Sequence, residues 1–307
     1  MAHVSDRVRA ACAWVAGRAR TVEIVAGAIE AYAAGLPAAE PPADAEVPLP
    51  GADREARAAF VICLDAINFG SGWWPTIRRR PGMSGYSTIE AGLVERFREA
   101  GAWSAEELTR LTPADVAGVF GQNPGHPLME RYADSLRDVG ERVLAEHADS
   151  FEALVEAARG SSPALADLLA GWKSFADVAT YEGEPVPFFK RAQIAAADID
   201  RMGVAELRDE ARLTAFADNL VPHVLRVDGV LALDRDLERR IDAEELLAHG
   251  SPEEVELRAC AVHAIELLSA ATDGLLSPAR IDAVLWNRGR GLRYKSRPRP
   301  RCRNTAY

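Results

Sequence analysis

Helical periodicity is the feature of this sequence that most constrains its fold, because it recurs along nearly the whole chain. In residues 88–101, for example, Ile89, Leu93 and Phe97 return to the same side of a helix. Similar patterns predict further helices at 5–35, 128–147, 150–159, 163–171, 204–210, 213–218, 221–227, 234–248, 252–273 and 278–286. The sequence therefore predicts a mainly α fold, a helical bundle with little or no β-structure.

Start signals support this interpretation. Residues 102–121 contain a Ser-x-Glu-Glu start and then a Thr-Pro-Ala-Asp start, with Pro113 at a first helical position. Residues 183–203 begin with a proline-broken entry and continue as a helix. The apolar run 58–69 is compatible with either a strand or a helix. Residues 37–52 and 70–87 are rich in Pro or Gly, which predicts a connecting loop and a loop or short hairpin.

Composition places the chain among ordinary globular proteins. Its 307 residues are 48% hydrophobic and 27% charged, and we expect one globular helical domain over 1–307. The net charge of −10 argues against a stable complex with a long nucleic acid, because phosphate contacts dominate that affinity. A small phosphorylated ligand held by a few cations stays compatible with it. The sequence has no apolar stretch of about 18 residues, so we expect no membrane span.

General chemical motifs are missing from the sequence. The four cysteines, at 12, 63, 260 and 302, have no close spacing, which disfavours a zinc ribbon and suits a reducing cytoplasm. The sequence contains no HExxH, Walker A, GxGxxG or GxSxG motif. We therefore expect neither a metal site nor an organic cofactor.

Two segments combine residues that suit nucleotide recognition. LDAINFGSGWW (64–74) places an Asp, an Asn and three large aromatics at the end of an apolar run. Aromatic faces stack on heterocyclic bases, although a core-edge turn explains the same pattern. FFKRAQIAAADI (188–199) places Lys190 and Arg191 at a helix start. Such a start is a phosphate cradle in one interpretation, and the two cations are ordinary surface residues in the other.

A third segment, TAFADNLVPHVL (214–225), contains an isolated carboxylate. Asp218 lies between apolar residues four positions before Pro222, so we expect it at a helix end or turn. It either faces a cavity or caps the helix that begins near Pro222. Asp282 and Trp286 form an i, i+4 pair that closes either a base pocket or the core. We interpret Glu256, on a long helix, as structural.

The end of the sequence, residues 287–307, is strongly basic in an acidic protein. A solvated, loosely packed end is one interpretation, and a contact with phosphate or RNA is the other. The spacing of its prolines favours an extended strand across the body of the protein.

Several of these motifs occur together in an order that resembles the queuosine salvage protein family, the queuosine 5′-phosphate N-glycosylase/hydrolases. The resemblance spans roughly residues 60–290, and residues 1–55 match only loosely. It implies a fold similar to helix-hairpin-helix DNA glycosylases, and hydrolysis of queuosine 5′-monophosphate to free queuine for tRNA modification. The motifs are INF (67–69), YEG…FFKRAQI…AD (181–198), FAD…VP (216–222), GS.EEVELRAC (250–260) and D..LW (282–286).

The resemblance also implies roles for particular residues. Asp218 is expected to be the catalytic carboxylate. Lys190 would be a second active-site residue that holds the 5′-phosphate, together with Arg191. Asp282 or Asp198 is expected to pair with the ammonium group of queuine. The residues expected to line the base pocket are Asn68, Phe69, Phe216, Asp282 and Trp286. The sequence departs from the family pattern at GSGWWP after Phe69 and at NRG after Trp286.

Three alternatives stay open at this point. A DNA or RNA base glycosylase is supported by the basic end of the chain but opposed by the acidic body. A queuine- or nucleotide-binding carrier would have the same pocket without turnover. A helical interaction scaffold would leave the three unusual segments without a reason to meet. We expect a small-molecule substrate and a cytoplasmic protein.

Overall fold

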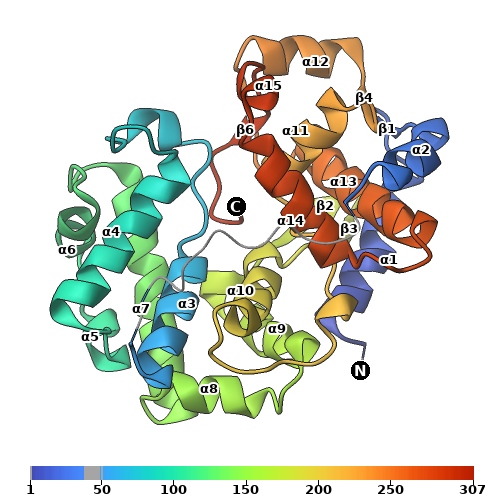
Figure 1. Ribbon diagram of the computed structural model, residues 1–307. Coiled ribbons are helices and arrows are strands. Elements are labelled where there is room, and N and C mark those ends of the chain that lie inside the picture. Colours follow the sequence, from blue (N-terminus) through green and yellow to red (C-terminus); the bar gives the residue numbers. More distant parts are fainter. Residues whose placement is uncertain (1, 38–48, 50) are drawn as a thin grey trace.

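The computed structural model describes residues 2–37, 49 and 51–307, and α-helices dominate this part of the chain (Figure 1). The prediction of a mainly α fold is confirmed, whereas the likeness to helix-hairpin-helix DNA glycosylases stays a prediction. The helices are α1 (Val4–Ala16), α2 (Ile29–Ala34), α3 (Arg54–Ala66), α4 (Gly85–Ala100), α5 (Ala105–Thr109), α6 (Pro113–Phe120), α7 (Pro127–His147), α8 (Phe151–Ala157), α9 (Ser162–Ala170), α10 (Lys190–Arg201), α11 (Leu220–Val227), α12 (Arg235–Asp242), α13 (Pro252–Ala271), α14 (Pro278–Gly289) and α15 (Leu292–Lys295).

Strands in the described residues form three separate pairs. Two are antiparallel: β1 (Val22–Ile24) with β4 (Leu231–Leu233), and β2 (Val178–Tyr181) with β3 (Glu184–Pro187). The third is parallel and joins β5 (Leu246–Leu247) to β6 (Arg301–Cys302), with Leu246 opposite Arg301. Each pair fastens segments of the helical framework, and the pairs do not combine into one larger sheet.

Capping residues explain where several helices begin. Both start signals in 102–121 are capping boxes: Ser104 begins α5, and Thr112 begins α6 with Pro113 at the first position. Ser251 and Ser277 cap α13 and α14 by simple N-caps, in which the side-chain oxygen accepts a backbone N–H of the first turn. The apolar run 58–69 lies mostly in α3, so its ambiguity is resolved in favour of a helix.

Two predicted helices are wrong in extent. The helix predicted at 5–35 ends at Ala16, because residues 22–24 pair with β4 across the chain. The helix predicted at 234–248 ends at Asp242, and Leu246–Leu247 pair with β6. In both places a pairing between segments distant in sequence overrides local periodicity.

The helices predicted at 204–210 and 213–218 are also wrong, since only the 3-10 turn Glu210–Arg212 forms there. Side chains take the backbone N–H groups that a helix would use. The N–H of Thr214 donates to Gln193 Oε1 at 3.0 Å, and the N–H of Phe216 donates to Asp282 Oδ1 at 2.9 Å. Of the predicted loop 37–52, residues 38–48 and 50 lie outside the described residues. Residues 70–84 form a loop with one 3-10 turn and no hairpin.

Two groups of helices face each other across the centre of the molecule. Figure 1 shows α3–α8 on one side, and α1, α2 and α11–α15 on the other. Helices α9 and α10 connect them, because α10 packs against α3 and α9, and α9 packs against α1. The alanines of α10 at 192, 195, 196 and 197 are fully buried and allow this close approach. The segment after α15 runs between the two groups, so the basic end of the chain is packed against the body.

Neither a membrane span nor a metal-binding cluster occurs among the described residues. No helix there is both long and apolar enough to cross a bilayer. No group of three or more His, Cys, Asp or Glu residues there has the arrangement of a metal site. All four cysteines are buried and unpaired.

Close packing between α5 and α7 generates a stability prediction. A methyl group on Gly140 would lie 2.5 Å from the Ala105 carbonyl oxygen and 2.8 Å from Leu108 Cβ. Gly140→Ala should therefore lower the free energy of unfolding by about 1–3 kcal/mol, despite the better helix propensity of alanine. Chemical denaturation measures the change. Gly118→Ala, at an exposed helical position with open space around it, is the control and should gain up to about 1 kcal/mol. Equal gains in both variants would contradict the packing.

Candidate active site

Lys190 and Asn68 meet at the junction of α10 and α3. Lys190 is the first residue of α10, and its ammonium group donates to Asn68 at the backbone oxygen (2.9 Å) and at Oδ1 (3.0 Å). Asn68 in turn donates from Nδ2 to Asp65 Oδ1 at 3.1 Å. Burial lowers the pKa of Lys190, and the nearby carboxylates of Asp218 and Asp65 oppose that shift. The structure thus brings together two of the predicted site residues.

A buried ion pair holds the start of α10. The backbone N–H of Lys190 donates to Asp177 Oδ2 at 3.1 Å, and Arg258 Nη2 donates to the same oxygen at 2.6 Å. Arg258 Nε also donates to the Ala217 carbonyl at 3.0 Å, immediately before Asp218. One arginine of α13 therefore connects the backbone of Lys190 to the backbone of Asp218.

Asp218 performs the capping role that was one of its two interpretations. Its Oδ1 accepts from the N–H groups of Leu220 (2.8 Å) and Val221 (2.9 Å), at the start of α11. Its Oδ2 accepts no hydrogen bond from the residues that the structure describes, and the side chain is half-buried. Burial raises the pKa of Asp218, while Lys190 and the two capping N–H groups act in the opposite direction. Capping and facing a site are thus compatible, because they use different oxygens.

Asp282 supports the loop that carries Asp218. Its Oδ1 accepts the N–H of Phe216 at 2.9 Å, and the carboxyl is 4% exposed. Burial raises the pKa of Asp282 well above its usual range, and the neighbouring charge of Asp218 adds to the shift. Phe216 itself is buried, with the guanidinium of Arg201 5.9 Å from the centre of its ring. The D..LW and FAD motifs therefore meet through a hydrogen bond.

Asp198 extends the acidic cluster towards α4. Burial raises its pKa to about 6, against the opposing charges of Arg201 and Lys190. Its charge also contributes to raised pKa values of Asp65, Tyr86 and Glu90, so these groups lie near it. The Tyr86 hydroxyl donates to Glu90 Oε1 at 3.2 Å.

Trp286 lies at the α4 side of this cluster. Its ring stands edge-on to the ring of Tyr86, with 6.0 Å between the ring centres. The Arg290 guanidinium lies 5.3 Å from the ring centre of Trp286. Trp286 is half-buried and packs against the main hydrophobic core, so both of its predicted roles stay open. Sequence reasoning missed Tyr86 and Glu90, because an i, i+4 Tyr–Glu pair also occurs on ordinary solvated helix faces.

Phe69 and Arg191 lie behind the site, within the core. Each is 1% exposed. Arg191 donates to the Ala66 carbonyl, and its guanidinium stacks 4.9 Å from the Phe69 ring centre and 5.7 Å from that of Phe175. Burial lowers the pKa of Arg191 to about 10. In this structure the two residues support the end of α3, and their contacts with a ligand stay a prediction.

Glu256 is structural, as predicted. Its Oε2 accepts hydrogen bonds from the backbone N–H groups of Arg20 and Thr21, at 3.0 and 2.7 Å, and its Oε1 accepts from the Tyr181 hydroxyl at 2.8 Å. These contacts fasten the N-terminal segment to α13. Both carboxylate oxygens of Glu256 therefore accept hydrogen bonds from the protein itself.

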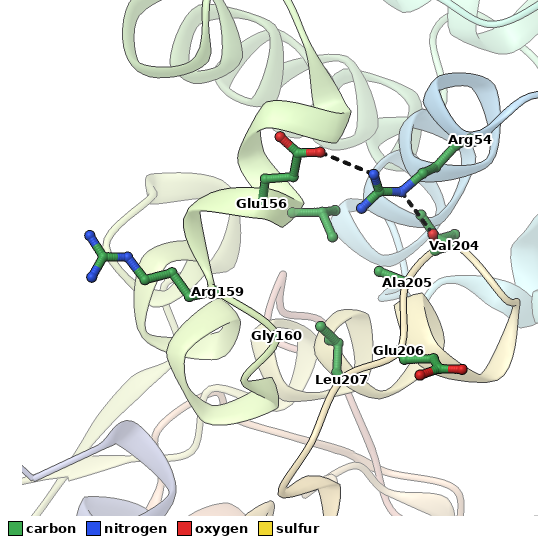
Figure 2. Close-up of a pocket in the computed structure, with 9 residues that line it drawn as sticks. Arg54, Glu156, Arg159, Gly160, Val204, Ala205, Glu206 and Leu207 are labelled. Atoms are coloured by element: carbon green, nitrogen blue, oxygen red, sulfur yellow. Dashed lines mark hydrogen bonds and ion pairs between the residues drawn. The ribbon is translucent and has the colours of Figure 1, made fainter.

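Two surface hollows lie elsewhere and hold none of the predicted site residues. Figure 2 shows one of about 380 Å³, where Arg54 reaches the Val204 carbonyl (3.0 Å) and Glu156 (3.0 Å). The other, of about 630 Å³, lies between the end of α1, β1, β4 and α13. The charged cluster therefore identifies the candidate site by its chemistry.

The fold and the cluster define a mainly helical protein in which one lysine lies among several buried carboxyl groups. The model of the family described as queuosine salvage protein matches residues 49–307, and the chain belongs to that family. The resemblance carried by the ordered motifs is thereby confirmed.

Curated relatives support the same conclusion, and each carries the name queuosine 5′-phosphate N-glycosylase/hydrolase. The relative from Sphaerobacter thermophilus is 36% identical over 267 residues, which cover 83% of this chain and 82% of the relative. The relative from Bos taurus is 30% identical over 271 residues, covering 80% and 79%. The relative from Dictyostelium discoideum is 27% identical over 262 residues, covering 82% and 79%.

The raised pKa of Asp198 generates a prediction about stability and pH. A carboxyl that binds its proton more tightly when folded makes the free energy of unfolding fall as pH rises from about 4 to about 6. Asp198→Asn should remove that part of the fall, on the order of 2 kcal/mol. Urea unfolding of both proteins between pH 4 and pH 7 measures it. Asp236→Asn, which removes an exposed carboxylate, is the control. Parallel pH profiles of wild type and Asp198→Asn would contradict the assignment.

Proposed function

We propose that this protein hydrolyses the N-glycosidic bond of queuosine 5′-monophosphate and releases queuine for reuse in tRNA modification. The name shared by the curated relatives supports this reaction. The observation that carries the proposal is the uncommitted Oδ2 of Asp218, close to Lys190 and Asp282 in a buried cluster. A carboxylate oxygen without a hydrogen-bond partner in such a cluster can stabilise the charge on an anomeric carbon, attack that carbon or activate water.

Asp218 is the proposed catalytic carboxylate. Hydrolysis of an N-glycoside passes through a sugar with oxocarbenium character, which a nearby carboxylate stabilises, attacks, or hydrates by activating water. Asp218 serves each of these roles only when it is ionised. Lys190 and the N–H groups of Leu220 and Val221 favour the ionised form against the effect of burial. The capping bonds also fix the direction of Oδ2, so the carboxylate is oriented before substrate binds.

The neighbouring carboxyl groups have different proposed tasks because their pKa values differ. Asp282, with a pKa well above the usual range, is suited to donate a hydrogen bond to the departing base as a neutral acid. Asp198, with a pKa of about 6, is ionised at neutral pH and suits the ammonium group of queuine. Trp286 and Tyr86 offer aromatic surface beside it, and Asn68 offers an amide.

Lys190 is proposed to act at the carboxylate cluster. Two of its three N–H donors are used by Asn68, and its charge faces Asp218, Asp65 and Asp282. Sequence reasoning assigned the 5′-phosphate to Lys190, but these neighbours favour a role in holding Asp218 ionised and in position. The phosphate then needs another cation.

A small-molecule substrate is favoured over a nucleic-acid polymer. The basic end of the chain was the feature that supported a polymer substrate, and its last residues pack into the body, with Cys302, Asn304, Ala306 and Tyr307 all buried. The acidic remainder of the surface repels a phosphate backbone. A cytoplasmic location, which the sparse cysteines favour, is part of the proposal.

Asp218→Asn tests the proposed catalytic carboxylate. Asparagine keeps the Oδ1 acceptor that caps α11, so the fold should persist while turnover falls by about 100-fold or more. The assay follows queuine release from queuosine 5′-monophosphate by chromatography. Asp234→Asn is the matched control, because Asp234 also caps a helix, accepting the N–H of Leu237 in α12 at an exposed position. Near wild-type turnover in Asp218→Asn would remove Asp218 from the mechanism, and no release by the wild type would favour the carrier alternative.

Lys190→Met tests the role of the lysine. The variant removes the charge from the cluster, so the pKa of Asp218 should rise and the acid limb of the activity–pH profile should move to higher pH. The loss in kcat/KM should be similar for the nucleotide and the unphosphorylated nucleoside. Lys173→Met, at an exposed position, controls for loss of a lysine. A loss confined to the nucleotide would instead assign the phosphate to Lys190.

A further inference from the structure

The segment after α15 is fastened beside Asp218. Asn219, the next residue after Asp218, donates from Nδ2 to the Pro300 carbonyl at 2.7 Å. Arg226, further along α11, donates from Nη2 to the Pro298 carbonyl at 2.9 Å. These two bonds hold the backbone on both sides of Arg299, and the two prolines further restrict it.

The same segment is also bound to the loop that follows α3. The N–H of Gly70 donates to the Tyr307 carbonyl oxygen at 3.0 Å. A side chain at Gly72 would overlap the backbone of Cys302, so only glycine permits this approach. The end of the chain therefore bridges the two segments that carry Asn68 and Asp218, and Figure 1 shows it between the two groups of helices.

Arg299 is an uncommitted cation at this bridge. It is half-buried, and its guanidinium forms no hydrogen bond or ion pair with any residue that the structure describes. Burial and the neighbouring charge of Arg301 lower its pKa, and Asp218 lies close enough to oppose that shift. By contrast, Arg301 bonds Glu244 at 3.2 Å, and Arg297 and Arg303 are exposed. A partly desolvated guanidinium without a partner favours binding of an anion.

We infer that Arg299 binds the 5′-phosphate of the substrate nucleotide. This inference rests on the proposed function. The sugar must lie against Asp218, so a phosphate on the same sugar needs a cation near Asp218 that is not already bound to protein. Arg299 meets this requirement, whereas Lys190 is bonded to Asn68 and Arg191 to the Ala66 carbonyl. The planar guanidinium matches a phosphate with two parallel hydrogen bonds.

The same placement explains how the end of the chain contributes to specificity. The bonds from Asn219 and Arg226 hold the backbone around Arg299, so the cation is positioned before the nucleotide arrives. Binding of a nucleoside without phosphate would leave the Arg299 guanidinium unpaired. The site should therefore discriminate against the nucleoside in favour of the nucleotide.

Arg299→Gln, compared with Arg301→Gln, tests the inference. The kcat/KM for queuosine 5′-monophosphate should fall by roughly tenfold or more in Arg299→Gln, towards the value for the nucleoside. The kcat/KM for the nucleoside should stay within about twofold of the wild type. Arg301→Gln, on the same segment but paired with Glu244, should lower the nucleotide value much less than Arg299→Gln does, because Arg301 acts on the site only through its charge near Arg299. Arg299→Lys, which keeps the charge without the planar fork, should recover part of the nucleotide activity.

Inorganic phosphate provides a second readout that does not depend on turnover. Phosphate should raise the melting temperature of the wild type and of Arg301→Gln, but not that of Arg299→Gln. Equal losses of activity on nucleotide and nucleoside, or an undiminished phosphate response in Arg299→Gln, would overturn the assignment. Absence of base release by the wild type, together with a phosphate response that Arg299→Gln abolishes, would overturn the proposed reaction and keep the anion site.

Discussion

The ion pair between Arg258 and Asp177 is the interaction on which the site depends. Its side chains are 1% and 3% exposed, and the N–O distance is 2.6 Å. Removing one partner of such a pair leaves a buried charge and costs about 3–5 kcal/mol. Here both partners also bond backbone, Asp177 at Lys190 and Arg258 at Ala217. The guanidinium further stacks 3.9 Å from the ring centre of Phe188 and 4.8 Å from that of Tyr307. One buried contact therefore sets where the lysine, the carboxylate and the chain end lie relative to each other.

Around this pair, the site separates carboxyl groups by their surroundings. Asp282 and Asp65 are buried where burial and neighbouring negative charge favour the neutral acid. At Asp218, burial also raises the pKa, but Lys190, two backbone N–H groups and Arg299 oppose that shift and favour the ionised form. Pairs of titratable groups whose pKa values are driven apart are suited to acid and base roles in one reaction. The charge of Lys190 lowers the pKa of several of these carboxyl groups, so loss of that charge would raise all of those pKa values.

The basic end of the chain illustrates how composition and packing diverge. Its net positive charge suggests a solvated tail, yet Cys302, Asn304 and Tyr307 are buried, and β6 pairs with β5. Tyr307 packs against the guanidinium of Arg258, whereas Arg297 and Arg303 of the same segment are exposed. Gly72, which permits the approach, and Gly70, whose N–H bonds Tyr307, belong to the segment 64–74 that the sequence assigned to nucleotide recognition or to a core-edge turn.

Local signals in the sequence determined most of the helices, because periodicity, serine and threonine caps and prolines act over a few residues. The start of α10, the capping position of Asp218 and the mainly α class follow from such signals. Long-range contacts decided the rest. Pairing of β1 with β4 ended the first helix, and Asp282 kept the Phe216 segment from becoming one. The packing of distant segments decides that Arg191 lies in the core and that Tyr86 and Glu90 lie near Asp198. It also decides the position of Arg299. Periodicity carries no information about such packing, because the contacts join residues far apart in the chain.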